Sequence, residues 1–135
     1  MIQSPQSIQV SRAGLTSPAV VAWRFENPGW AVSIESTEFE PVEAHADDAF
    51  EALCLVREQL EPHGWLLGVA GAQLDVWPSG MARDQGGGKV AYRMTIDGAM
   101  GVVDTFQPVD PATVTTVTHQ RAEYDRLLEA WQQKG

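Results

Sequence analysis

The stretch that decides the fold is Ala19–Glu35, which reads AVVAWRFENPGWAVSIE. Apolar residues alternate with other residues on both sides of Asn27-Pro28-Gly29, a tripeptide typical of turns. Because successive side chains of a strand point to opposite faces, this alternation gives each strand one apolar face. The sequence therefore predicts a β-hairpin that buries one of its faces.

A helix is predicted after this hairpin. It begins at Asp47 or Asp48, whose side chains suit a helix N-terminus, and its apolar residues recur at helical spacing as far as Leu60. Pro62-His63-Gly64 is expected to end it, because Gly64 suits a left-handed cap.

The second half of the chain predicts more strands and one more helix. Strands are expected at residues 65–69, 74–77, 90–96 and 102–106. Pro78–Gly88 is expected to form a loop. A single helix is predicted from Pro111 to about Gln133, because Asp110-Pro111 is typical of a helix start and apolar residues recur at helical spacing.

These elements predict an α+β fold, with an antiparallel or mixed sheet of about five to six strands and two helices packed on one face. The 135 residues fit a single domain, 1–135. Residues 1–17 are polar and small and are expected to form a loose lead-in, although Ile8 and Val10 are compatible with a short edge strand.

The negative charge is concentrated in one window of the sequence. From Phe25 to Val56 there is no lysine or arginine, and eight acidic residues account for −8 of the net charge of −9. They are Glu26, Glu35, Glu38, Glu40, Glu43, Asp47, Asp48 and Glu51. This argues against direct binding of nucleic acid, which needs clustered basic residues, and favours a basic protein partner. The alternative is a solvated face that continues into a helix N-terminus.

The Gly-rich loop 78–89 is the strongest local feature, because connections of this length are uncommon without a purpose. Ser79, Arg83, Asp84 and Lys89 are candidates for an anion or phosphate site in a small enzyme or ligand-binding domain. The loop is not a P-loop, since the Gly-Lys-Ser/Thr ending is absent.

No residue pattern indicates catalysis, a bound metal or another cofactor. His45, His63 and His119 lack metal-ligand spacing, and the single Cys54 falls on the apolar side of the predicted helix. The first five residues lack the features of a signal peptide, and no apolar run is long enough to span a membrane. We therefore expect a cytoplasmic protein that does not bind membranes.

Two stretches of the chain resemble a known group of proteins. The first is Asp48–Arg57 with Gly64-Trp65, and the second is Gly71–Asp84, which continues through Gly86–Gly88 to Ala91-Tyr92. Together they resemble small bacterial immunity proteins of polymorphic toxin and contact-dependent growth inhibition loci. The core of the resemblance is Pro-Ser-Gly-Met-x-Arg-Asp, and Gln85 stands where the pattern has methionine.

This resemblance implies an antitoxin that binds and neutralises a cognate toxin domain and needs no active site. Toxins that cut nucleic acid have basic clefts, to which an acidic inhibitor is steered rapidly. We expect the toxin-binding surface to combine acidic residues of the window with residues of the Gly-rich loop. The predicted contact residues are Glu38, Glu40, Glu43, Asp47, Asp48, Met81, Arg83 and Asp84.

Overall fold

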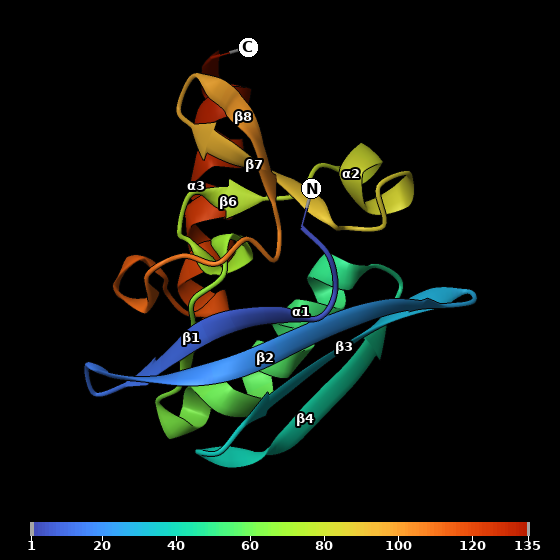
Figure 1. Ribbon diagram of the computed structural model, residues 1–135. Helices are drawn as coiled ribbons and strands as arrows, with labels where there is room; N and C mark the ends of the chain where they lie inside the picture. Colours follow the sequence, from blue (N-terminus) through green and yellow to red (C-terminus); the bar gives the residue numbers. More distant parts are fainter. Residues whose placement is uncertain (1, 135) are drawn as a thin grey trace.

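The structure, a computed structural model, describes residues 2–134 and has an α+β fold with two antiparallel sheets (Figure 1). The larger sheet has the strand order β4-β3-β2-β1-β5, and the smaller one has the order β6-β7-β8. The strands of the larger sheet are β1 Gln6–Arg12, β2 Leu15–Glu26, β3 Gly29–Ser36, β4 Phe39–Ala46 and β5 Leu66–Leu67. Those of the smaller sheet are β6 Val76–Trp77, β7 Val90–Thr95 and β8 Gly98–Asp104. The predicted fold class is confirmed, with the strands divided between two sheets.

The predicted hairpin forms the centre of the larger sheet. In β2 and β3, Val21 lies opposite Ile34 and Trp23 lies opposite Val32. Val21, Val32 and Ile34 are fully buried, which confirms that the alternation marks a buried face. Burying aliphatic side chains of this size contributes about 1.5–3 kcal/mol each, so this face stabilises the fold strongly.

The expectation of a loose lead-in is wrong for residues 6–12 and 15–17, which belong to β1 and β2, and Met1 lies outside the described residues. The strand β1 pairs with β2 along its whole length and buries Ile8 and Val10. The two strands are joined at Ala13-Gly14, where both residues have positive φ angles of 53° and 80°. Such a turn fits the twist of a hairpin, and Gly14 adopts it without a steric penalty.

The helix α1, Ala49–Leu60, packs against the buried face of the larger sheet, as predicted (Figure 1). Asp48 caps it, because its side chain accepts a hydrogen bond from the backbone N–H of Glu51. A short 3-10 helix, Glu61–His63, follows it and ends at Gly64 with a φ of 89°. The predicted left-handed cap is therefore confirmed.

The predicted strands at 65–69 and 74–77 shrink to the two-residue strands β5 and β6. Between them Ala70–Ala72 form a 3-10 helix, which breaks the extended chain. The predicted loop 78–88 contains a short helix, α2 Gly80–Asp84, because the Ser79 side chain caps it by accepting from the N–H of Ala82. Serine is a favoured N-cap residue, and it nucleates this turn.

The single helix predicted from Pro111 to Gln133 is also wrong at its start. A 3-10 helix, Pro111–Thr113, is followed by extended chain, and α3 begins only at Val117 and runs to Lys134. In the extended part Val114 bridges to Gln73, and β-branched residues favour such a conformation. The Thr116 hydroxyl then accepts from the N–H of His119 and caps α3.

The helix α3 lies along the smaller sheet, where aromatic side chains hold it (Figure 1). Tyr124 stacks on Trp77 with 5.3 Å between ring centroids. The indole N–H of Trp131 donates to the carbonyl oxygens of Thr95 and Ile96. In residues 2–134 no helix is long and apolar enough to cross a membrane.

Candidate partner-binding site

The predicted contact residues do not form one patch, because they lie at the two ends of β4, with Glu43 in the middle of the strand. Glu38 and Glu40 lie at the β3–β4 turn, and Asp47 and Asp48 lie at the start of α1. The strand between them has eight residues, which span about 23 Å at ~3.3 Å per residue. Figure 1 shows the turn at the lower left and α2, with the remaining predicted contacts, at the upper right.

At the α1 end, two of the predicted contacts neutralise each other. Asp48 is buried, and its Oδ2 lies 3.1 Å from Nη1 of Arg83. The Arg83 guanidinium also lies over the rings of Phe50 and Trp77. Both side chains therefore hold α2 against α1. Met81, in contrast, is 67% exposed, as its predicted contact role requires.

Asp84 and Asp47 complete this end of the predicted surface. Both side chains are exposed. Together with Met81 they are accessible to a partner, whereas Asp48 and Arg83 are occupied within the fold.

In the middle of β4, Glu43 belongs to a compact charge cluster on the outer face of the sheet. Arg24 donates from Nη1 to Glu43 across 3.0 Å and contacts Glu26 across 2.6 Å. His45 bridges the same two carboxylates, at 3.0 Å and 3.3 Å. The hydrogen bond from Arg24 lowers the pKa of Glu43. Glu43 is thus ionised but locally compensated.

Four acidic side chains near the β3–β4 end remain uncompensated. They are Glu35, Glu38, Glu40 and Asp110. Among residues 2–134, no lysine, arginine or histidine forms an ion pair with any of them. Two of them accept hydrogen bonds from uncharged donors: Glu38 accepts from the Ser17 hydroxyl, and Asp110 accepts from the N–H of Ala112.

A hollow of about 910 Å³ lies beside these carboxylates. Ser7, Val20 and Glu35 line it and face one another across β1, β2 and β3. They are out of phase with the buried Val21 and Ile34, so the hollow lies on the face of the sheet that points away from α1. The other lining residues are Ile8, Gln9, Pro18, Ala19, Ser36, Thr37, Pro41, Pro108, Val109 and Asp110.

The glycines of the Gly-rich loop pack against the start of α1. The carbonyl oxygen of Gly87 accepts from the N–H of Ala49 at 2.7 Å, so it satisfies a free donor of the helix. A Cβ on Gly88 would lie 2.6 Å from both the Asp48 carboxylate and the backbone nitrogen of Phe50. Close packing therefore explains these glycines without a ligand.

The proposed anion ligands of this loop do not converge. Ser79 caps α2, Arg83 is paired with Asp48, and Asp84 is exposed. Lys89 points elsewhere, with its Nζ 5.3 Å from the ring centroid of Trp30. Lys89 does line a smaller hollow of about 270 Å³, whose other lining residues are Ile2, Trp23, Gln85, Gly86, Val90, Asp104 and Phe106.

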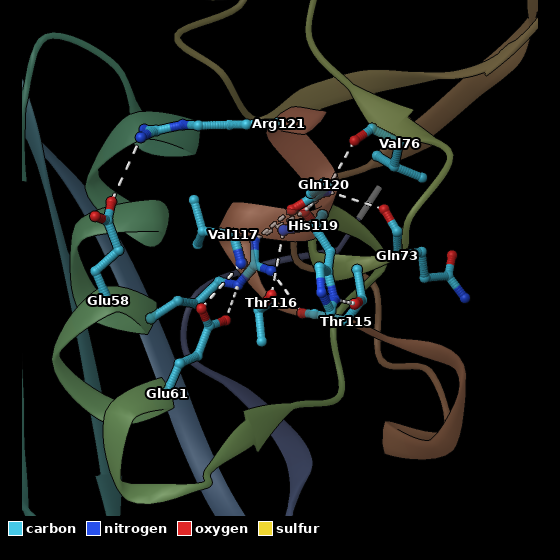
Figure 2. A network of polar contacts seen from close by, with 12 residues as sticks. Glu58, Glu61, Gln73, Val76, Thr115, Thr116, Val117, His119, Gln120 and Arg121 are labelled. Atoms are coloured by element: carbon cyan, nitrogen blue, oxygen red, sulfur yellow. Dashed lines mark hydrogen bonds and ion pairs between the residues drawn. The ribbon is translucent and has the colours of Figure 1, made fainter. Parts of the chain in front are cut away.

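A buried polar network that was not predicted from the sequence joins α1 to α3. Arg57 of α1 is fully buried and donates to Oε1 of Gln120 in α3 at 2.7 Å and to the carbonyl oxygen of Thr115 at 2.8 Å. Its Nε lies 3.2 Å from Glu61, which also accepts from the N–H of Val117. Figure 2 shows Glu61, Thr115, Val117 and Gln120 gathered around this network.

Gln120 extends the network to the chain between β5 and β6. Its amide nitrogen contacts the carbonyl oxygens of Gly71, Gln73 and Val76 at 2.7–2.9 Å. Burial lowers the pKa of Arg57, and it raises the pKa of Glu61. Arginine stays charged, because its ordinary pKa lies far above neutral pH. The signal in the sequence was the helical spacing of Arg57, which shares the apolar side of α1 with Leu53 and Leu60.

The histidines and the cysteine belong to different elements: His45 to β4, Cys54 to α1, His63 to the 3-10 helix Glu61–His63 and His119 to α3. His63 and His119 are exposed, and His119 contacts the Thr115 hydroxyl through Nδ1. In residues 2–134, no group of three His, Cys, Asp or Glu side chains could hold a metal ion. Cys54 is buried in α1, and this burial raises its pKa to about 11.

Cys54 is therefore expected to resist alkylation. With a pKa of about 11 the buried thiol is protonated at pH 8, and the thiolate is the reactive form. Native protein treated with iodoacetamide at pH 8 should remain unlabelled by mass spectrometry, while protein in concentrated urea should gain one label. Equally fast labelling in both conditions would contradict this.

No known protein-family model matches the chain, and no curated protein has significant sequence similarity to it.

Proposed function

We propose that this protein is an immunity protein that binds and neutralises a cognate bacterial toxin domain. The observation that carries the proposal is the group of uncompensated carboxylates beside the hollow of the larger sheet, Glu35, Glu38, Glu40 and Asp110. Unpaired acidic groups at an accessible, partly apolar surface are suited to a basic protein surface. The resemblance of residues 48–92 to immunity proteins supports the same function.

The charge distribution also supports fast recognition. Long-range attraction raises association rates between oppositely charged proteins, and the effect weakens as salt screens it. The negative field of this protein comes from its net charge of −9. A toxin domain with a basic cleft would therefore be captured most rapidly at low ionic strength.

The test is a binding experiment with the toxin domain encoded directly beside this gene. We expect co-expression to protect cells from that toxin domain and the purified proteins to form a complex whose association rate falls about tenfold or more from low to high salt. Surface plasmon resonance at several salt concentrations measures this. Absence of both protection and complex formation would overturn the proposed function.

A second candidate function is that of a ligand-binding domain, favoured by the smaller hollow. Gln85, Gly86 and Lys89 of the Gly-rich loop line it beside the stacked rings of Trp23 and Phe106. Lys89 supplies a positive charge for an anion, and the rings supply an apolar wall. Thermal-shift measurements with nucleotides and sugar phosphates test this, since a ligand bound only by the folded state raises the melting temperature. No shift at millimolar ligand would argue against it.

A further inference from the structure

The hollow on the outer face of the larger sheet is lined in part by exposed apolar side chains. Its floor includes Val20, which is 42% exposed, together with Pro18 and Pro41. Exposed apolar side chains in a recess gain free energy when a partner covers them. A surface of this kind holds an apolar side chain better than flat polar parts of the sheet do.

The charge around this hollow has one sign. None of its lining residues is basic, whereas Glu35 and Asp110 line it and Glu38 and Glu40 lie between the lining residues Thr37 and Pro41. The remaining acidic residues of the window are mostly paired, with Arg24 serving Glu26 and Glu43. Of the acidic residues of the window that form no ion pair within residues 2–134, Glu35, Glu38 and Glu40 lie at the recess and Asp47 lies at the α1 end.

The occupant is identified by complementarity of charge and shape. A second copy of this chain also has a net charge of −9, so it would bring acidic groups against acidic groups. An open recess of about 910 Å³ accepts several side chains of a protruding loop. Basic side chains on such a loop would meet the four carboxylates while an apolar side chain at its tip covers Val20.

We infer that this hollow is the toxin-docking site, and that it receives a protruding loop of the toxin domain with an apolar tip and flanking arginine or lysine side chains. The inference rests on the proposed function and narrows it, because it assigns binding to the β3–β4 end. The other end, with Asp47, Met81 and Asp84, then lies outside the contact.

Two matched pairs of variants test the docking site against the adjacent toxin domain. The double variant Glu38→Lys/Glu40→Lys is compared with Asp125→Lys/Glu129→Lys, which changes the net charge equally on exposed positions of α3. Val20→Arg is compared with Val102→Arg, since Val102 is an exposed valine of β8. Urea unfolding of every variant establishes that it is folded before binding is measured.

We expect Glu38→Lys/Glu40→Lys and Val20→Arg each to raise the Kd at least about 30-fold, as central interface residues do. The charge variant should also lose most of the salt dependence, while both control variants stay within about threefold of wild type. Hydrogen exchange in the complex should show protection at residues 7–9, 18–20 and 35–41.

The outcomes separate the two proposals. If wild type binds the toxin domain but the hollow variants bind equally well, the docking site is wrong and the proposed function stands. Loss of binding in Asp47→Lys/Asp84→Lys alone would place the contact at the α1 end and also overturn the inference. If wild type neither binds nor protects, both proposals are wrong.

Discussion

Replacing Arg57 by methionine is expected to lower the free energy of unfolding by about 3–5 kcal/mol, the usual cost of removing one partner of a buried ion pair. The substitution leaves the partly buried Glu61 without its cation. It also removes the guanidinium N–H groups that donate to Oε1 of Gln120 and to the carbonyl oxygen of Thr115. Methionine fills most of the space of the arginine side chain, so the loss of stability comes mainly from the lost hydrogen bonds and ion pair. Urea denaturation at neutral pH, followed by tryptophan fluorescence, measures it.

Arg121→Met is the matched control, because it removes an arginine that is also paired but exposed. Arg121 contacts Glu51 and Glu58 at 3.3 Å and 3.8 Å on the surface. Such pairs contribute at most about 1 kcal/mol. Equal losses in the two variants would show that the buried network does not hold α1 and α3 together. An unchanged m-value would confirm that both variants unfold from the same folded state.

The parts of the fold that the sequence predicts are those decided by neighbours along the chain. The hairpin Ala19–Glu35 follows from alternation around a turn, and α1 follows from apolar spacing between Asp48 and Gly64. Each of these signals lies within 17 consecutive residues. They can therefore be recognised in the sequence without knowledge of the tertiary structure.

The parts that it misses depend on distant partners. The strand β4 has glutamates at outward positions and Pro41 in its middle, so its alternation is weak, and it is a strand because β3 pairs with it. The start of α3 is set by the bridge between Val114 and Gln73. The buried network of Arg57 has partners that lie more than 50 residues away in the sequence.

The candidate site shows the same division between local and distant effects. The window of eight acids is visible in the sequence, but its compensation is not, because Arg24, Arg83 and Arg121 lie outside it. These cations neutralise the acids nearest to them and leave the β3–β4 end exposed. The net charge summed along the sequence therefore overstates how many acidic residues are available to a partner. The ion pairs of the folded protein occupy several of them.

Gly88→Ala is expected to destabilise the fold by about 2–5 kcal/mol through a conformational and a steric effect. Gly88 has a φ of 74°, which costs an alanine about 1–2 kcal/mol. Its new Cβ would also lie 2.6 Å from the backbone nitrogen of Phe50, which cannot move without displacing the start of α1. Overpacking of this kind adds about 1–3 kcal/mol.

Gly14→Ala separates the two effects. Gly14 has a similar φ of 80°, but a Cβ there would meet nothing within 4 Å, so only the conformational cost of about 1–2 kcal/mol is expected. Urea unfolding of both variants measures the difference. If Gly88→Ala costs no more than Gly14→Ala, the loop does not pack on α1 as described. A larger loss would instead show that this glycine is required by the fold, and it would remove the main reason for assigning the Gly-rich loop to a phosphate ligand.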